Sequence, residues 1–444
     1  MIFQTLRNGK QKLLNNNVEL FWISVGLFVQ SVAGVVILKL LASFLTADKY
    51  GIYNLLNSIT QFLEVVVFSS LIQGAGRFAY QSGSVNHSFD IVERLNLKLF
   101  AGFIFVFLTV VAYFLFNSKY HHSILTLVLI PVILFNVKRD TLLGVFHMNR
   151  NRRLVSFYRS SEQLLKTGAI FLLAVMSLLS IENIFISFSI ITFFICFLLL
   201  KEKRKFLLRE THISEPADEE KVKLKKHIVA FALPFALLSV FTWAQTWADR
   251  WVLKNFLSLE TIGIYSANSQ IGNYPFSMLA SLFLMFFTPK LFKECSDVQS
   301  QSELTVLKRR INKVLLLYFL LSVVGFWLFM VAKNLVLGAI LPPEYLKSGS
   351  LFFFVTLGWL LFNVGMVQST LSLHTAGYPT FVLYANIISG CSYILMLFVF
   401  IKTFGAVGAA YALVASNFIK ILFQYFFSLR AWGKFRKAHF AITQ

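Results

Sequence analysis

The sequence has few charged residues and very few cysteines. Only 14% of its 444 residues are Asp, Glu, Lys or Arg, whereas 57% are hydrophobic. A soluble domain of this composition would expose large apolar patches, so a soluble globular protein is excluded. The three cysteines, Cys196, Cys295 and Cys391, are too few and too scattered for a disulfide framework or a metal site. This composition is typical of a polytopic membrane protein.

The sequence also lacks the motifs of common catalytic sites. It contains no metal-ligand spacing, nucleophile elbow or glycine-rich phosphate loop. The pair His121–His122 has no carboxylate partner and is interpreted as part of a solvated outer loop. No outer connection is long enough to carry a catalytic domain. We therefore expect a protein that is not an enzyme and needs no cofactor or metal.

Acidic residues are half as numerous as basic ones, 20 against 41, which gives a net charge of +21. In a soluble protein this excess would suggest a nucleic-acid partner. Here the basic residues fall in short segments between apolar runs, as the positive-inside rule requires. We expect membrane lipids, and no nucleic acid, as partners. The basic and polar residues 1–17 are interpreted as a cytoplasmic tail ahead of the first helix.

Twelve apolar runs are long enough to cross a membrane, which takes ~20 residues. They cover 19–44, 53–79, 99–117, 124–146, 161–180, 184–200, 228–250, 264–288, 314–334, 349–372, 380–401 and 408–428. The predicted fold is an all-α polytopic membrane protein with about twelve transmembrane helices in two pseudo-symmetric six-helix bundles. The N-terminal lobe is expected at 1–200, a charged cytoplasmic linker at 201–227, and the C-terminal lobe with a basic tail at 228–444.

A ten-residue segment occurs twice, as FLTADKYGIY at 44–53 and FLSLETIGIY at 256–265. Five positions are identical, and each copy lies between two apolar runs. Each is therefore predicted to form a tight turn between membrane helices. Gly51 and Gly263 would supply the backbone freedom of the reversal, and Tyr53 and Tyr265 would lie at headgroup level. A repeat near half the chain length indicates two similar lobes.

Successive connections between the predicted spans alternate between the two sides of the membrane, and this places nearly all basic loops on one side. Both termini are therefore expected in the cytoplasm. Both repeated turns then lie on the outer side, and the lobes form a parallel repeat. Two lobes around a central gap indicate a transporter that works by alternating access. The alternatives for a twelve-helix protein are a membrane-embedded enzyme and an assembly scaffold.

Charged residues inside the predicted spans are the functional candidates, because a charge in the bilayer is costly unless it faces a cavity or a partner. The candidates for substrate binding are Arg77, Arg139, Lys166, Asp249 and Arg250. Glu162 lies four residues before Lys166 and is predicted to pair with it. The surplus of positive charge suits an anionic substrate, and arginine forks onto phosphate oxygens. Three lysines are interpreted as snorkelling to the interface: Lys39, Lys138 and Lys333.

Glu64 is the candidate ion-coupling residue. It lies near the middle of the span 53–79, and its repeat equivalent is Phe276, so the lobes differ in charge at matched depth. The alternative is a carboxylate that is hydrogen-bonded to Gln61 or to a neighbouring helix and has no role in transport. Lys420 is a further charge near the middle of a span. Neutral groups that could bind sugar hydroxyls are Thr242, Gln245, Thr246, Asn363, Gln368, Ser369 and Thr370.

Several motifs together resemble one known family. They are the G-I-Y turn in each half, FALPFALLS around Pro234, ADRWVLKNFLSLETIGIYS (248–266), LPPEYLKSG (341–349) and GAVGAAYALVASN (405–417). The chain resembles the polysaccharide-transporter branch of the MOP superfamily, the Wzx-type O-antigen and capsule flippases. The likeness covers nearly the whole chain, and Asp249–Arg250 matches the family's D-R at the end of helix 7.

The resemblance implies a MATE-like fold and a flippase in the bacterial inner membrane. Its substrate would be undecaprenyl-diphosphate-linked oligosaccharide, moved from the cytoplasmic to the outer leaflet. The implied partners are this lipid-linked oligosaccharide, a polysaccharide polymerase and glycosyltransferases. The alternatives are an exporter of another amphiphile, such as a peptidoglycan precursor or a drug, and a membrane scaffold that organises glycosyltransferases. A cation exporter is disfavoured because helix 1 has no carboxylate within its apolar run beyond Glu19, the residue that begins it.

Overall fold

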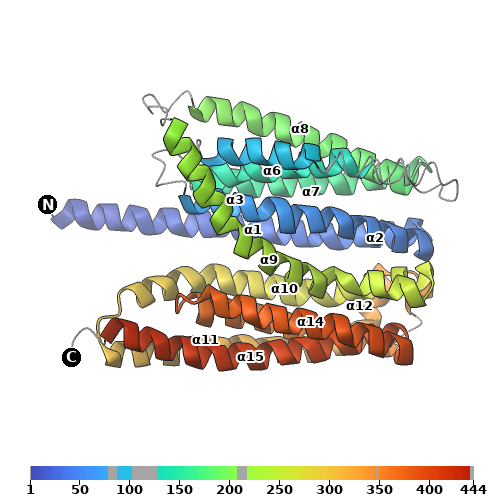
Figure 1. Ribbon diagram of the computed structural model, residues 1–444. Helices are drawn as coiled ribbons and strands as arrows, with labels where there is room; N and C mark the ends of the chain where they lie inside the picture. Colours follow the sequence, from blue (N-terminus) through green and yellow to red (C-terminus); the bar gives the residue numbers. More distant parts are fainter. Residues whose placement is uncertain are drawn as a thin grey trace. The chain divides into compact units, whose positions relative to one another are not determined.

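The computed structural model describes residues 2–78, 88–102, 128–149, 151–207, 218–346 and 349–440, and within them every regular element is a helix (Figure 1). Nine of the described helices are long and apolar enough to cross a membrane. Two more helices, α6 (Leu129–Met148) and α7 (Arg152–Val175), overlap the predicted spans 124–146 and 161–180. Charged residues interrupt the apolar stretches of both helices, Lys138–Asp140 in α6 and Glu162 and Lys166 in α7. The predicted all-α polytopic membrane fold is confirmed.

Contacts divide the chain into two compact units. Unit 1 comprises residues 1–44 and 56–239, and unit 2 comprises residues 45–55 and 240–444. Two of the boundaries fall inside long helices, α2 (Ala47–Phe62) and α9 (Asp218–Phe256). The lobes expected at 1–200 and 228–444 stay a prediction, as does the linker at 201–227.

Unit 1 is a set of helices that lie side by side (Figure 1). Its elements are α1 (Ile2–Phe44), the end of α2 from residue 56, the π-helix η1 (Leu63–Phe68), α3 (Ser69–Phe78), the helical residues 88–102, α6, α7, α8 (Ile181–Leu207) and the first half of α9. Helix α1 packs on α7, where the Ser156 hydroxyl donates a hydrogen bond to the Trp22 carbonyl at 2.9 Å. Hydroxyl groups bonded to a neighbouring helix are typical of membrane-embedded packing.

Unit 2 contains the remaining helices. They are the start of α2 up to residue 55, the second half of α9, α10 (Leu259–Ser296), α11 (Gln301–Val331), α12 (Lys333–Ile340), the 3₁₀ turn η2 (Pro343–Leu346), α13 (Gly349–Gln368), the π-helix η3 (Ser369–His374), α14 (Pro379–Phe404) and α15 (Ala406–Phe440). The closest neighbours are α14 with α15, α13 with α15, and α10 with α13.

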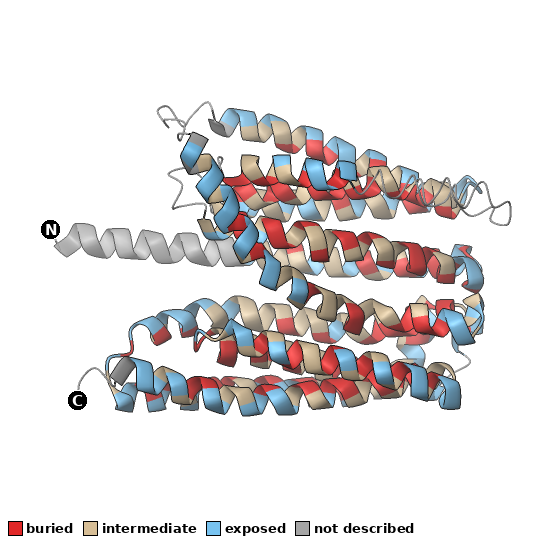
Figure 2. Ribbon diagram, in the orientation of Figure 1, coloured by how far each residue is buried: buried red, intermediate tan, exposed pale blue. Residues whose placement is uncertain are grey.

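The apolar side chains of α11 show how the helices are oriented. Buried residues recur every three or four positions, from Leu304 and Leu307 to Ile311 and Val314, so one helical face packs inward. Most of the other large apolar side chains are exposed, and Val331 reaches 85%. Burial follows such stripes along the other helices as well (Figure 2). Exposed apolar faces of this extent are stable only against lipid.

The repeated segments form helix–helix turns, but the glycines are not their pivots. The reversals lie at Leu45–Thr46 and Leu257–Ser258, and both glycines are inside the following helices, α2 and α10. Neither Gly51 nor Gly263 has a positive φ. The predicted role in the reversal is therefore wrong. Equivalent backbone bonds begin the two helices, because Tyr50 N donates to Thr46 O at 2.9 Å and Ile262 N donates to Ser258 O at 3.2 Å.

The glycines instead allow α2 and α10 to approach closely within unit 2. A Cβ on Gly51 would lie 2.3 Å from the Leu259 carbonyl oxygen, and one on Gly263 would lie 1.9 Å from the Ala47 carbonyl oxygen. Residues 47 and 259 are equivalent in the repeat, so this contact is symmetric. The tyrosines are also not presented to headgroups, since Tyr53 is 8% and Tyr265 is 0% exposed.

Some predicted features lie outside the described residues. These are most of the span 99–117, the first residues of the span 124–146, His121–His122, part of the linker and two residues of LPPEYLKSG.

Candidate functional site

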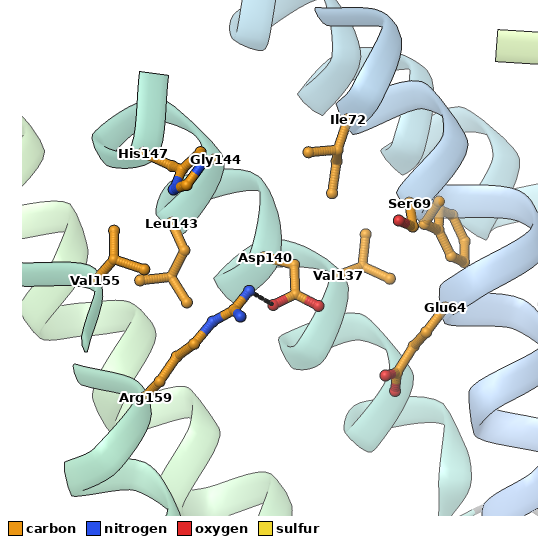
Figure 3. Close-up of a pocket in the computed structure, with 11 residues that line it drawn as sticks. Glu64, Ser69, Ile72, Val137, Asp140, Leu143, Gly144, His147, Val155 and Arg159 are labelled. Carbon is orange, nitrogen blue, oxygen red and sulfur yellow. Dashed lines mark ion pairs between the residues drawn. The ribbon is translucent and has the colours of Figure 1, made fainter. Parts of the chain in front are cut away.

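A cavity in unit 1 lies between the α2–η1–α3 helix, α6 and α7, and has a volume of about 370 Å³ (Figure 3). Its polar lining comes from Glu64, Ser69, Asp140, His147 and Arg159, and the rest is apolar. Arg159 faces Asp140 across the cavity at 4.0 Å. A concave apolar site with a few convergent polar groups is the usual form of a ligand site.

Glu64 reaches this cavity from the π-helix η1. The Ser69 N–H donates to the Glu64 carbonyl, a hydrogen bond from i+5 to i that widens the helix at this point. Segments of this kind occur frequently at functional sites. The Glu64 side chain accepts a hydrogen bond of 2.6 Å from the Asn136 amide on α6. The alternative interpretation of Glu64 expected such a bond to a neighbouring helix, and it is found.

Arg139 connects Asn136 to an ion network behind the cavity. Its Nη1 donates to Asn136 Oδ1 at 3.0 Å and to Glu162 Oε1 at 2.7 Å. Its Nε and Nη2 donate to the two oxygens of Asp140, both at 3.1 Å. The Asn136 amide is thus fixed from both ends, as acceptor from Arg139 and as donor to Glu64. All three guanidinium nitrogens are bonded to partners on the protein.

Glu162 is the most buried member of the network, at 4% exposure. Besides Arg139, its Oε1 accepts hydrogen bonds from Lys166 Nζ at 2.6 Å and from Thr192 Oγ1 on α8 at 3.1 Å. The predicted Glu162–Lys166 pair is therefore confirmed. A continuous path of hydrogen bonds runs from Glu64 through Asn136, Arg139 and Glu162 to Lys166, and it links η1, α6 and α7.

The charges of this network are balanced. Glu64, Asp140 and Glu162 supply three carboxylates, and Arg139, Arg159 and Lys166 supply three cations. The predicted surplus of positive charge at membrane depth is thus not found around Arg139. If Glu64 binds a proton, the same six groups carry a net charge of +1.

The predicted pair Asp249–Arg250 lies elsewhere, in the core of unit 2. The two side chains are 0% and 2% exposed, and Arg250 Nη1 lies 2.8 Å from Asp249 Oδ1. Tyr265 of α10 donates to Asp249 Oδ2 at 2.7 Å, and the Arg250 guanidinium lies over the Trp247 ring at 4.4 Å. This cluster joins the end of α9 to α10, and it lines none of the cavities described here.

Lys420 of α15 is a second buried charge in unit 2, at 4% exposure. Its ammonium donates to Gln245 Oε1 at 3.1 Å and lies 4.7 Å from the centroid of the Phe362 ring. Gln245 in turn donates to Ser389. Among the described residues no carboxylate forms an ion pair with Lys420. Gln424, one turn along α15, is buried, and both ends of its amide lack a hydrogen-bond partner.

The other predicted residues are separate from the cavity. Arg77 is exposed on α3, in the last turn of that helix. Lys39 is exposed, as expected of a snorkelling side chain, but Lys138 is paired with Glu93. Some of the predicted sugar-binding groups make hydrogen bonds within unit 2. For example, the Asn363 amide donates to Asn273 Oδ1 at 3.1 Å.

Sequence reasoning did not assign a role in the site to Asn136, His147, Arg159 or Thr192. For Asn136 a signal exists, because it lies one turn before Arg139 on the same face of α6. The other three lie on α6, α7 and α8, and their contacts depend on how these helices pack, which the local sequence does not reveal.

Comparison with known proteins gives one family. Residues 18–294, more than half of the chain, match the family described as "Polysaccharide biosynthesis protein". Among curated protein sequences, none matches this chain.

Solved structures with the same fold include transporters of several kinds. The lipid II flippase MurJ in its inward closed conformation is 15% identical, covers 93% of this chain and 89% of its own, and has a TM-score of 0.64. A multidrug resistance MATE family transporter of the MOP superfamily, in an outward-facing conformation, is 13% identical. It covers 94% of this chain and 96% of its own, with a TM-score of 0.66. A MOP superfamily transporter from Pyrococcus furiosus is 10% identical. It covers 95% of this chain and 96% of its own, with a TM-score of 0.61. These likenesses confirm the predicted MATE-like fold.

Proposed function

Because the chain belongs to the polysaccharide biosynthesis protein family, we propose that it is a flippase for undecaprenyl-diphosphate-linked oligosaccharide. The cargo is the repeat unit of an O-antigen, capsule or exopolysaccharide, and it is moved from the cytoplasmic to the outer leaflet by alternating access. The family match carries the proposal, because residues 18–294 include the cavity of unit 1 and its whole ion network. The shared fold of a lipid II flippase supports the same class of cargo.

The proposal includes a location and partners. The protein is a multi-pass membrane protein, and we place it in the bacterial inner membrane with both termini in the cytoplasm, on the basis of its basic loops. It acts as a transporter, without catalysis, cofactor or nucleic acid. A polysaccharide polymerase and glycosyltransferases are the proposed protein partners, because they consume and supply the cargo.

Glu64 is the proposed coupling residue. Support comes from its position on the cavity wall, on the π-helix, and at one end of the hydrogen-bonded path to Lys166. A proton on Glu64 changes the formal charge of the six-group network from zero to +1. A positive network attracts a diphosphate more strongly, so proton binding and cargo binding favour one another.

The proposed substrate contacts are Arg77, Arg139, Lys166, Asp249 and Arg250. Arg77 is the member best suited to touch a diphosphate directly, because its side chain is exposed. Arg139 and Lys166 border the cavity through their bonds to Asp140, Asn136 and Glu162. A contact of the buried Asp249–Arg250 pair with cargo requires the cluster around Tyr265 to open.

The test is deletion of the gene, followed by analysis of lipid-linked intermediates. A flippase predicts accumulation of complete diphosphate-linked repeat units on the cytoplasmic leaflet, and recovery of surface glycan when the wild-type chain is restored. The purified protein should move the same lipid from one leaflet to the other in the bilayer of proteoliposomes. Normal surface glycan in the deletion strain, with no accumulated intermediate, would contradict the proposal.

A second candidate is an exporter of another amphiphile, such as a peptidoglycan precursor or a drug. The observation that favours it is the fold, which matches multidrug transporters at a TM-score of 0.66 and a lipid II flippase at 0.64. Drug susceptibility or loss of peptidoglycan synthesis in the deletion strain, with surface glycan intact, separates this candidate from the first.

A further inference from the structure

Asn136 of α6 is the point at which Glu64 joins the ion network of unit 1. Its side chain is buried, and its amide nitrogen Nδ2 donates to Glu64 Oε1 at 2.6 Å. Its amide oxygen Oδ1 accepts from Arg139 Nη1 at 3.0 Å. In the part of the chain that the structure describes, the Glu64 carboxylate has no other hydrogen bond and no ion pair. The direct link between Glu64 and the network therefore consists of this one side chain.

Arg139 determines which end of the Asn136 carboxamide faces Glu64. An amide has an acceptor at one end and a donor at the other, whereas a guanidinium has donors only. Arg139 can therefore bond to the amide oxygen but not to the amide nitrogen. Three further hydrogen bonds of Arg139, to Glu162 and to both oxygens of Asp140, hold the guanidinium in place. Asn136 is thus kept with its N–H group toward Glu64.

A donor held in this way acts differently on the two protonation states of Glu64. A hydrogen bond to an ionised carboxylate is stronger than one to a neutral carboxyl group. The Asn136 donor therefore favours the ionised form. A proton on Glu64 weakens this bond in turn. The bond from Arg139 to Asn136 responds, because linked hydrogen bonds polarise one another.

The charged and titratable groups nearest to Glu64 come from two helices. Three are on α6 and three are on α7: Arg139, Asp140 and His147, then Arg159, Glu162 and Lys166. The other residues of η1 are all apolar. Since none of the six is bonded to the Glu64 carboxylate within the described ranges, they act on it through space or through Asn136.

The remaining neighbours of η1 contribute no direct partner either. Helix α3 continues η1 and has Arg77 in its last turn, ~20 Å along the axis from Glu64. The helical residues 88–102 approach η1 at Phe100, whose ring lies 6.5 Å from that of Phe68. The acidic side chains of this helix form ion pairs with other helices, listed as Asp90 with Lys203 and Glu93 with Lys138.

We propose that Asn136 is a positioning residue for Glu64. It holds the carboxylate toward α6, favours its ionised form and transmits the effect of proton binding to Arg139. The inference rests on the proposed function, because proton exchange at Glu64 is part of that function. It adds that the network behind the cavity regulates this exchange. A side chain that only holds η1 against α6 would affect stability but not proton binding.

The test measures proton binding at Glu64 in the absence of cargo. The full-length protein in phosphatidylcholine nanodiscs is titrated with acid while the infrared C=O stretching band of protonated carboxyl groups is recorded. The component that Glu64→Gln lacks belongs to Glu64. In Asn136→Leu, which removes the donor at similar volume, we expect this component to appear at a pH about one unit higher than in the wild type. Its stretching frequency should also rise, because the C=O group loses a hydrogen bond.

A second variant and a control accompany this measurement. Asn136→Asp keeps an oxygen for Arg139, so it retains the network if Asn136→Leu does not fold. Its carboxylate cannot donate to Glu64 and adds a negative charge, so it should also shift proton uptake to higher pH. The control Asn96→Leu removes another buried amide, which donates to Thr141 of α6 at 3.3 Å. We expect no shift in this control.

Unchanged proton uptake in Asn136→Leu and Asn136→Asp would overturn the proposal, and so would an equal shift in Asn96→Leu. The pH profile of flipping in proteoliposomes is measured separately, with diphosphate-linked oligosaccharide as cargo. Equal shifts in the infrared titration and in the flipping profile support both the role of Asn136 and the coupling role of Glu64. An infrared shift with an unchanged flipping profile supports Asn136 as a positioning residue and removes Glu64 as the coupling group.

Discussion

Gly51 and Gly263 lie against each other at equivalent positions of the internal repeat, and the backbone nitrogen of each is 3.2 Å from the place that a Cβ on the other would occupy. Both sit in helices, one in α2 and one in α10. Small residues let membrane helices approach closely, and here they let the two copies of the repeat serve as packing partners.

Replacing either glycine by alanine should destabilise unit 2. The added Cβ would meet backbone carbonyl oxygens at 2.3 Å or 1.9 Å, and backbone cannot rotate away. We expect Gly51→Ala and Gly263→Ala each to lower the free energy of unfolding by about 1–3 kcal/mol. Thermal unfolding in detergent measures this. Gly325→Ala is the control, because a Cβ there has no neighbour within 4 Å. Equal melting of Gly263→Ala and Gly325→Ala would show that the close approach is absent.

Arg139→Ala should reduce the amount of folded protein. The change leaves Glu162 and Asp140 without their guanidinium partner in a mostly buried network, and breaking such a pair costs about 3–5 kcal/mol. Arg250→Ala should act in the same way through Asp249. Membrane protein level and surface glycan are measured together. If both alanine variants accumulate normally, the network is not what holds these helices.

Arg77→Ala should behave differently, because this side chain is exposed. We expect a normal protein level and reduced surface glycan if Arg77 contacts the diphosphate. Arg77→Lys should restore part of the glycan, since the charge survives but the two-pronged hydrogen bonding does not. Full surface glycan in Arg77→Ala would remove this residue from the proposed site.

Glu64→Gln should uncouple transport from a proton gradient. The amide oxygen can still accept from Asn136, so the shape of the cavity is kept while proton binding is lost. We expect proteoliposome flipping that no longer responds to an imposed pH gradient, with cargo binding retained. Glu182→Gln on α8 is the control outside the network. Gradient-driven transport at the wild-type rate would eliminate Glu64 as the coupling group.

Lys420→Met should preserve or raise stability. The ammonium is buried against an amide oxygen and a ring, and Met fills a similar volume without a charge to desolvate. We expect a gain of about 1 kcal/mol or more. Lys434→Met, at an exposed position of the same helix, should have little effect. Reduced transport in a stabilised Lys420→Met protein would show that the charge is kept for function; a loss of stability would show that it holds α15 to α9.

Much of the fold follows from the sequence. Apolar runs predicted 53–79 and 264–288, and the structure has helices over Ala47–Phe78 and Leu259–Ser296. The Glu162–Lys166 pair was predictable because residues four apart on one helix share a face. The contribution of Arg139 to that pair was not, since it depends on how α6 is rotated against α7. Local spacing carries no information on that rotation.

Two other features had no usable sequence signal. A glycine in a turn and a glycine at a helix crossing look alike in sequence, and so Gly51 and Gly263 were assigned to the reversal. The π-helix around Glu64 differs from an α-helix only in the partner of its hydrogen bonds, from i+5 instead of i+4. The residue types of Leu63–Phe68 give no sign of this change of hydrogen-bond partner.

The two units share α2 and α9, which cross from one unit to the other without a break. Because each is a continuous helix, any displacement of one unit against the other must bend these two helices. A helix bends most easily where its ladder of hydrogen bonds is interrupted. In α9 this place is Pro234, which lacks an N–H and lies close to the boundary at 239/240. In the helix that continues from α2, the interruption is the π-helix η1, Leu63–Phe68. Glu64 lies in that segment, so flexure of the helix and the proposed exchange of a proton would occur within the same six residues.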